Sequence, residues 1–478
     1  MNPRSTRSIQ NIPEDVARLI AFYALPSRPT PSRSQSPLSL SQVSSAWRNV
    51  VLAASELWST LFIFVKPVNS DTLDIFQRQA IEWLMRAEGR PLSIFFRFGV
   101  DANLRFEPDR DELLGIHNFL IGLYPFIPQA RRLGFGYAHI NQLLGLLSKV
   151  PWSVVNLEAL DIVSAFGDEE VIPFHRFTAA PIFNHVPKLR QLVVKGQCML
   201  DSVESALALP WSRLTKVAFA DSCLPIMTWV NIIRSCPQME FGELNILCVD
   251  DEDLEQYRSA NQRHTQLKTL NLKMTIKLVE FISLFQFTSL RNLYLKSDLC
   301  EAGVFPPASY FQNFHGLRSL YIDFSKDIDI TLLIHILREG RNIEELTLIH
   351  MDKKKNLLFE AMSYDKSPRI LPHLGFLRIE VVPEADSELQ ELQPHWRSLY
   401  NMLISRTIGT MPSGYDQLQK LSLSEHSTTK ARHPGVYFPV VHTLTQMLSP
   451  CREAGVEILL GECSELDWIP MHISAFEM

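Results

Sequence analysis

A six-residue leucine pattern recurs along most of the chain and limits what it can fold into. A leucine-like residue is followed by two others, a second leucine-like residue, one other and a third. Alternate residues of a strand point the same way, so the second and third leucine-like side chains of each copy enter one core. The copies begin at Leu157, Leu189, Leu214, Leu267, Leu290, Leu317, Ile343, Leu374 and Leu418, with weaker members at Leu244 to Ile246 and Ile458 to Leu460.

The spacing of these copies predicts a solenoid. Most successive second leucines lie 23 to 27 residues apart, and steps of 31, 32 and 44 residues imply inserted loops. Each copy leaves an apolar edge uncovered until the next one stacks on it, so residues 131–478 are expected to form a curved parallel sheet. Segments such as 228–236 and 330–340 read as helices on the convex side. The region resembles irregular leucine-rich repeats.

Side chains that lie between the strand leucines are the candidates for binding a target. They face the open side of the predicted sheet, opposite the core, as Asn271 does between Leu270 and Leu272. A row of such side chains would offer a partner protein polar and aromatic contacts. The candidates are Glu158, Lys216, Asn271, Tyr294, Tyr321, Thr347 and Arg378.

Residues 62–130 are expected to link the N-terminal stretch to the array and to hold its first repeats. Residues 59–65 form an apolar run of strand length, residues 71–88 carry a helical apolar stripe, and Pro91 opens a second strand-like run to 98. A strand, a helix, a short turn and a strand predict parallel pairing.

Residues 11–61 read as three short helices with a Pro- and Ser-rich interruption at 26–37. Pro13 suits the first position of a helix, and Glu14 and Asp15 place negative charge in its first turn. A unit of about 50 residues buries little surface by itself, so it must dock on the rest of the chain or on another protein. The apolar stripes of the three helices are Val16, Leu19, Ile20 and Tyr23; Leu40, Val43, Trp47, Val50 and Ala54; and Leu57, Trp58 and Leu61.

Three segments of this stretch resemble an F-box of the kind expanded in mushroom-forming fungi. They are Ile-Pro-Glu-Asp-Val-x-x-x-Ile, Leu-Ser-Gln-Val-Ser-x-x-Trp-Arg-x-Val and Leu-Trp-Ser-x-Leu. The chain departs from that pattern in the longer insert from Pro26 to Pro37, and in Ser41 and Ser44, where such fungal sequences often carry Cys. The ordered landmarks that carry the resemblance are Pro13, Val43, Trp47, Leu57 and Trp58.

The resemblance places an F-box at residues 9–61, after a polar tail at 1–8. It implies docking onto a Skp-type adaptor and, through that adaptor, onto a cullin-based ubiquitin ligase. Trp47 and Trp58 fit an internal core of the F-box as well as a contact surface. The residues expected to contact the adaptor are Ile12, Pro13, Val16, Leu19, Leu40, Val43, Trp47, Val50, Leu57 and Trp58.

Composition excludes several classes of protein. No apolar run approaches the roughly 18 residues that span a bilayer, and the first ten residues lack the apolar core of a secretory signal. The seven cysteines are scattered without a CxxC pair, which fits buried thiols in a reducing compartment, the cytosol or the nucleus.

Of the net charge of −6, residues 1–50 carry +4 and the remainder −10. A basic front suits an acidic adaptor, and an acidic body argues against nucleic-acid binding.

Motifs for catalysis, cofactors and metals are missing from the sequence. It has no phosphate-binding loop, no GxGxxG and no zinc spacing of His and Cys. Cys223 and Cys236 read as structural thiols, and the acidic run at 250–253 and the lysines at 353–355 read as solvated loops. Ser36, which precedes Pro37, could be phosphorylated, but the segment also reads as a plain spacer.

These features predict a non-enzymatic adaptor without cofactor or metal. Its helical front would bind a Skp-type protein, and its solenoid would hold an unknown target protein near the ligase. The alternative is a leucine-rich-repeat scaffold, unconnected with ubiquitination, whose front helices merely cap the first repeat. An enzyme on a repeat scaffold lacks any convergent polar motif.

Overall fold

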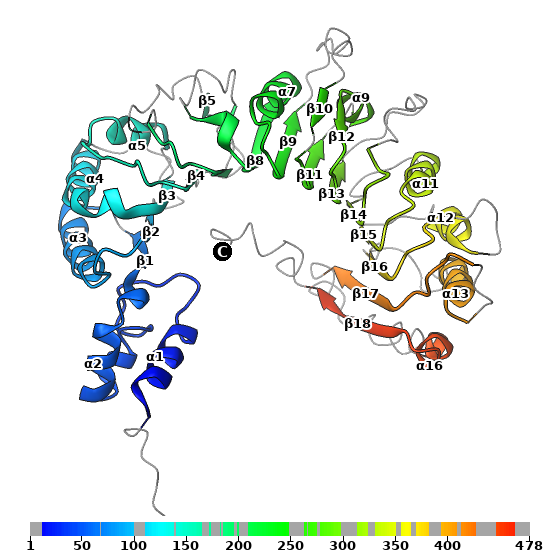
Figure 1. Cartoon of the computed structure of the whole chain (residues 1–478), viewed down its shortest axis with the longest axis horizontal. Helices are drawn as coiled ribbons and strands as arrows, with labels where there is room; N and C mark the ends of the chain where they lie inside the picture. Colours follow the sequence, from blue (N-terminus) through cyan, green and yellow to red (C-terminus); the bar gives the residue numbers. More distant parts are fainter. Residues whose placement is uncertain are drawn as a thin grey trace, which may run out of the picture. The chain divides into compact units, whose positions relative to one another are not determined.

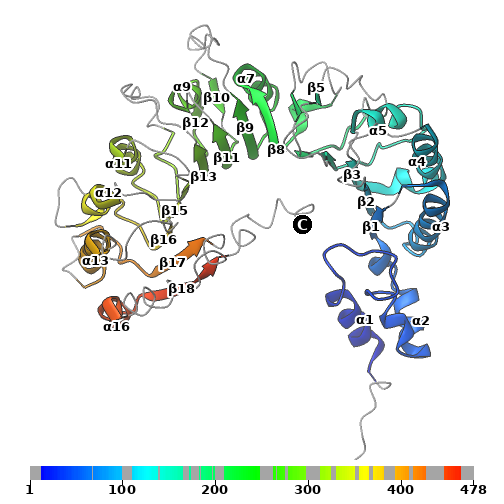
Figure 2. The same ribbon diagram turned by 180° about the vertical axis from the view of Figure 1, so that it is seen from behind.

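The computed structural model describes most of the chain, with gaps. Within the described residues the chain forms two compact units, unit 1 up to Cys223 and unit 2 from Leu224 onward. Each unit is a row of parallel strands with helices against one face, and unit 1 begins with additional helices (Figures 1 and 2). The described residues are 12–66, 68–99, 110–137, 140–164, 172–173, 182, 185–195, 198–199, 209–247, 262–264, 266–274, 278–297, 313–323, 330–349, 355–364, 370–381, 393–408, 413–426 and 446–463.

Unit 1 opens with four short helical segments, here called the N-terminal helical module. They are α1 (Glu14–Tyr23), the 3-10 turn η2 (Leu40–Gln42), α2 (Ser45–Ala53) and the 3-10 turn η3 (Ser55–Trp58). The apolar stripe from Leu40 to Ala54 predicts one helix, but in the structure this segment forms two, η2 and α2. Ser44 has extended backbone and its hydroxyl accepts a hydrogen bond from the Trp47 N–H at 3.2 Å, so it ends η2 and caps α2.

The strands of unit 1 follow one another in chain order and all pair in parallel. A separate pair joins β5 (Ile172–Pro173) to β7 (Cys198–Met199). Helices cover one face of the main sheet (Figure 1). The strands are β1 (Thr60–Val65), β2 (Leu92–Phe98), β3 (Ala130–Tyr137), β4 (Ala159–Ser164), β6 (Gln191–Lys195) and β8 (Lys216–Pro225). The helices are α3 (Ser70–Met85), α4 (Arg110–Gly122), η4 (Tyr124–Gln129), α5 (Ile140–Leu147) and η7 (Trp211–Arg213).

Unit 2 continues the same alternation, with every pairing in its main sheet parallel. A short pair joins β10 (Gln262–His264) to β12 (Phe285–Phe287). The main strands are β9 (Phe241–Leu247), β11 (Thr269–Met274), β13 (Asn292–Ser297), β14 (Ser319–Asp323), β15 (Glu345–Ile349), β16 (Phe376–Val381), β17 (Lys420–His426) and β18 (Glu457–Cys463). The helices are α7 (Ile226–Ser235), α9 (Leu278–Ser283), α11 (Ile330–Glu339), α12 (Lys355–Met362), α13 (Gln393–Thr407) and α16 (Ser449–Glu453).

The strand leucines form the core, as the recurring pattern predicts. Leu270 lies beside Leu293, and Leu293 lies beside Leu320, so equivalent positions of successive repeats stack directly. These side chains are buried. One alignment differs from the sequence prediction, because Leu270 pairs with Gly242 and Leu272 pairs with Leu244. Leu244 is therefore the third position of its repeat, not the second, and Gly242 takes the place expected for a leucine.

The fold is thus a helical front followed by an irregular, leucine-rich-repeat-like parallel solenoid. The strand repeats begin before the first copy of the leucine motif at Leu157, because β1 and β2, from the segment expected to hold the first repeats, pair in the same sheet as β3 and β4. In unit 2 a buried asparagine bonds to backbone groups of β12. Asn313 accepts a hydrogen bond from the Phe287 N–H at 2.7 Å and donates to the carbonyl of Phe285 at 3.1 Å.

Candidate partner-binding surfaces

The apolar stripe of α1 faces outward. Leu19 is 56% exposed and Tyr23 is 79% exposed, and Val16 and Ile20 are exposed with them. The face of α1 that packs against the module carries the small residues Ala17 and Ala21, both buried. The large side chains of this stripe, including the predicted adaptor contacts Val16 and Leu19, therefore lie on the surface of this chain. We call Val16, Leu19, Ile20 and Tyr23 the α1 stripe.

Further apolar side chains of the module are uncovered. Val43, just after η2, is 57% exposed, and Leu52 on α2 is also exposed. Pro13 is exposed at the start of α1. Ile12, Leu40 and Val50 are half-buried. Seven of the ten residues predicted to contact an adaptor are thus wholly or partly accessible: Ile12, Pro13, Val16, Leu19, Leu40, Val43 and Val50.

The other three predicted contact residues need correction. Trp47, Leu57 and Trp58 are buried inside this chain, so their side chains belong to its own core. The indole N–H of Trp58 donates to the Val51 carbonyl at 3.0 Å, and its ring meets the edge of Trp83 on α3 with centroids 4.8 Å apart. The buried reading of the two tryptophans, one of the two that the sequence allowed, is the one that the structure shows.

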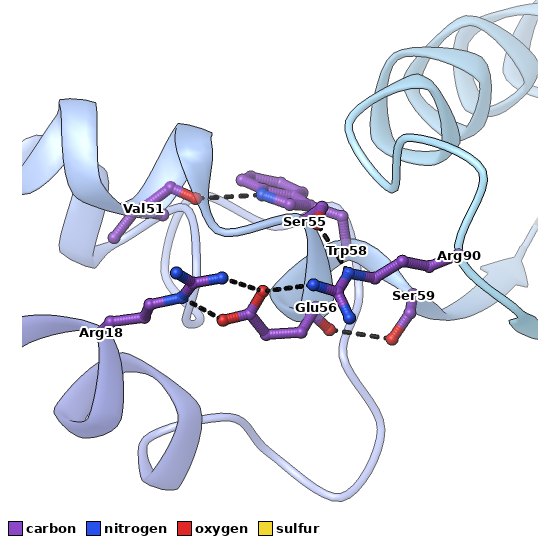
Figure 3. Close-up of polar contacts among 7 residues, drawn as sticks. All are labelled: Arg18, Val51, Ser55, Glu56, Trp58, Ser59 and Arg90. Atoms are coloured by element: carbon purple, nitrogen blue, oxygen red, sulfur yellow. Dashed lines mark hydrogen bonds and ion pairs between the residues drawn. The ribbon is translucent and has the colours of Figure 1, made fainter. Parts of the chain in front are cut away.

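An ion-pair cluster holds α1 against η3 (Figure 3). The Arg18 guanidinium donates twice to the carboxylate of Glu56, with Nη2 and Oε2 2.7 Å apart. Arg90, which follows α3, lies 3.5 Å from the same carboxylate and donates to the Ser55 hydroxyl at 2.6 Å. The hydrogen bond from Arg18 lowers the pKa of Glu56 below its usual value, although partial burial opposes the shift. The stripe on α1 is therefore held outward by a charged contact on the helix's other side.

The open face of unit 2 collects most of the predicted target-binding residues. Strand register places one residue from each of the consecutive strands β11, β13, β14, β15 and β16 in a single row. Two neighbours in the row are in ring contact, with 5.5 Å between the centroids of Tyr294 and Tyr321. Burial, together with the nearby charge of Glu345, raises the pKa of Tyr294. The row is Asn271, Tyr294, Tyr321, Thr347 and Arg378.

The remaining two predicted residues lie elsewhere. Lys216 begins β8 in unit 1, and Glu158 precedes β4, where it is 3.4 Å from Arg131 in an ion pair. The position in β4 that corresponds to the row is Asp161, which the sequence reading did not select. Asp161 is 1% exposed and accepts a 2.7 Å hydrogen bond from Arg132. Burial raises the pKa of Asp161, against the opposing effect of Arg132 and Lys216. Its place between Leu160 and Ile162 was the signal that could have identified it.

Other candidate sites from the sequence have structural explanations or lie outside the described residues. Cys236 is buried, which raises the pKa of its thiol to about 12, and a thiol that stays protonated suits a structural role. Ser36 is buried, so its hydroxyl is withdrawn from the surface where a kinase would act. The run at 250–253 and the lysines at 353–354 lie outside the described residues, as does the tail at 1–8.

Among the described residues, no three or more His, Cys, Asp or Glu side chains gather as metal ligands do. In the same part of the chain no helix combines the length and apolar character that crossing a membrane requires. No protein-family model and no curated protein matches the chain.

Proposed function

We propose that this protein is the substrate-recognition adaptor of a Skp–cullin–F-box ubiquitin ligase. The observation that carries the proposal is the α1 stripe, an apolar helical face that the chain leaves uncovered while a charged contact behind it fixes its direction. Large apolar groups on one exposed helix favour a partner that completes the core. The order of landmarks that resembles an F-box favours a Skp-type adaptor as that partner.

The alternative, a module that only caps the first repeat, fits part of the structure. Trp58 and Leu57 are buried, and Trp58 packs on Trp83 as a cap would. A terminal cap, however, normally has a polar outer face that keeps a solenoid soluble. Val16, Leu19 and Val43 give this module an apolar outer face, which favours docking over capping.

The solenoid would hold the target protein, and the chain itself would be non-enzymatic. The row from Asn271 to Arg378 offers hydroxyl, amide, aromatic and guanidinium groups along adjacent strands. The ligase's other subunits would supply catalysis, and the adaptor would raise the local concentration of target near a ubiquitin-loaded enzyme. This role belongs in the cytosol or the nucleus.

Capture of the adaptor tests the proposal. The full chain, expressed with an affinity tag in its own cells, is expected to recover a Skp-type protein and a cullin. Leu19→Asp should abolish recovery, because it places a charge in the centre of the apolar contact. Leu114→Asp, at a residue of α4 that is 54% exposed against 56% for Leu19, provides the matched control and should recover both partners.

Two results would count against the ligase role. One is the absence of any Skp-type protein or cullin from the recovered proteins. The other is equal recovery by wild type and Leu19→Asp, which would place the contact elsewhere. Both variants change exposed side chains, so their folding stability should stay within about 0.5 kcal/mol of wild type.

A further inference from the structure

The open face of unit 1 is basic, although the protein as a whole carries a net charge of −6. Strand register from β1 to β8 aligns three rows on the face opposite the helices. The first row contains Arg132 and Lys216, and the last row contains Arg97 and Lys195. Among these aligned positions the one acid is Asp161, in the middle row. We call these four cations the unit 1 rails.

The corresponding rows of unit 2 are mixed in charge. Their acids and bases are nearly equal in number, so no comparable field arises there. The acids are Glu243, Asp323, Glu345, Glu380 and Glu457, and the bases are Lys273, Lys296, Arg378 and Lys420. The basic character therefore belongs to unit 1 specifically.

A fifth cation comes from the N-terminal module. The Pro26–Pro37 insert contacts the edge of β1, where the Phe62 N–H donates to the Pro29 carbonyl at 2.7 Å. Arg28 of the insert lies over the Phe62 ring, 5.7 Å from its centroid, and Arg97 lies at the same distance from the ring of Phe64. The long insert thus adds positive charge to the start of the same face.

Between the two rows of cations, the middle row is apolar except for Asp161. The middle row runs through Phe95, Gly134, Val193 and Ala218, which are buried, with Phe62 stacked on Phe95 at 4.3 Å between centroids. Arg132 lies over the ring of Phe95 at 5.2 Å. Arg97 is exposed, and Lys195 and Lys216 are half-buried. Phe64 and Gln191 are exposed on the same rows, but the one acid, Asp161, is buried, so the accessible charged groups of these rows are cations.

The distance between the cations indicates which kind of anionic ligand fits this face. Neighbouring strands lie about 4.8 Å apart, and Arg97 and Lys195 are three strand steps apart in the last row, or about 14 Å. Arg132 and Lys216 are also three steps apart in the first row. A single phosphate is held by cations that converge on one point. Cations about 14 Å apart instead match carboxylates about four residues apart in an extended chain, which rises about 3.3 Å per residue.

We propose that the open face of unit 1 binds an extended segment of a target protein in which Asp or Glu recur about every fourth residue. The segment crosses the strands along the rails, with its carboxylates on Arg97 and Lys195. This inference rests on the proposed role of the solenoid in holding a target, and it needs neither the Skp-type adaptor nor the cullin.

Peptide binding to the full chain tests it. Two fluorescein-labelled peptides of equal length and charge are compared by fluorescence anisotropy at low salt, one with Glu at every fourth residue and one with its Glu residues adjacent, both otherwise Gly and Ser. The spaced peptide should bind more tightly. Arg97→Gln and Lys195→Gln should each weaken its binding about three- to fivefold, and the double variant about tenfold or more.

A charge-matched control uses Lys149→Gln with Lys188→Gln, two exposed residues of unit 1 outside the strands, and should bind as wild type does. The proposal is overturned if the spaced peptide fails to bind, if the control loses as much affinity as the rail variant, or if the clustered peptide or one phosphoserine peptide binds better. Tighter binding of an oligothymidylate would also overturn it, as a general polyanion site. If adaptor capture fails while the spaced peptide still binds, the ligase role is contradicted and the peptide-binding proposal stands.

Discussion

Glu56 joins three parts of unit 1 through one carboxylate. It accepts hydrogen bonds from Arg18 on α1 and is ion-paired with Arg90, which precedes β2. Its pKa is lowered chiefly by the Arg18 hydrogen bond. A carboxylate with a folded-state pKa below its unfolded value stabilises the fold above the unfolded pKa, and this stabilisation is lost as pH falls through the folded pKa.

We therefore expect Glu56→Gln to lower the melting temperature at neutral pH but to have progressively less effect in acid. The reason is that protonation of wild-type Glu56 removes the same charge that the substitution removes. Thermal melts of both proteins from about pH 7 down to about pH 3.5 check this, since that range spans the ordinary titration of Glu. Glu82→Gln on α3, at an exposed position, is the control. A difference from wild type that stays constant with pH would contradict the assignment.

Arg406 is a buried cation held by backbone carbonyls. It is 0% exposed, and it donates to the carbonyls of Met362 at 2.8 Å, Ile370 at 2.8 Å and Leu371 at 3.0 Å. The Tyr364 ring centroid lies 4.4 Å from its guanidinium carbon. Burial lowers the pKa of Arg406 to about 10. Leu371 has φ of +52°, a conformation that costs a non-glycine residue free energy and that neighbouring contacts must hold.

Arg406→Met is expected to lower the free energy of unfolding by about 2–4 kcal/mol, because three buried carbonyls lose their donors. Chemical denaturation followed by circular dichroism measures the change. Arg397→Met alters an exposed residue of the same helix, α13, and should change stability by no more than about 0.5 kcal/mol. Equal stability of the two variants would show that the carbonyls find other partners.

At the scale of elements, the module depends on how its helices end. Ser44 separates η2 from α2, because its hydroxyl oxygen accepts a hydrogen bond from the Trp47 N–H. The break turns Trp47 inward while Val43, one residue before the cap, stays exposed. A single continuous helix would have placed both on one stripe, as the sequence pattern suggested.

Ser44→Ala should destabilise unit 1 by about 1 kcal/mol, the usual cost of losing a helix cap. Ser45→Ala, one residue later and exposed, keeps the cap and should have little effect. Thermal melting of the two variants provides the comparison. If Ser45→Ala proved the more damaging change, the cap would not explain the break.

At the scale of the whole molecule, the structure is built from contacts between successive repeats. Within unit 2 each main strand pairs with the strand of the next repeat, so β13 lies between β11 and β14. Stability in such arrays is close to a sum of repeat and nearest-neighbour terms. A core substitution in one repeat should therefore act mostly on the repeats beside it.

Leu293→Ala in β13 tests this locality. Leu293 is buried, and its truncation should cost about 2–5 kcal/mol. Hydrogen exchange should accelerate in β11, β13 and β14 and stay close to wild type in β2 and β3. Uniform acceleration across all of these strands would mean that the chain unfolds as a single cooperative block, against the expectation for an array.

Much of the fold could be predicted from the leucine spacing. Strands with period two put Leu270, Leu293 and Leu320 in the core whatever their neighbours are, since alternate side chains must share a face. The open-face row from Asn271 to Arg378 follows from the same rule. The alignment of Gly242 with Leu270 did not follow, because repeats of unequal length leave the register to the packing between strands.

The sequence by itself determined which side chains share a face, because local backbone geometry sets that pattern. Only the tertiary structure decided which face is covered. On α1 the face that carries Ala17 and Ala21 packs inward, and Arg18 is hydrogen-bonded to Glu56. Val16, Leu19 and Tyr23 remain exposed. Likewise Arg97 and Lys195, far apart in sequence, occupy one row only because parallel pairing aligns their strands. Burial and surface charge depend on contacts between distant segments, which no local pattern contains.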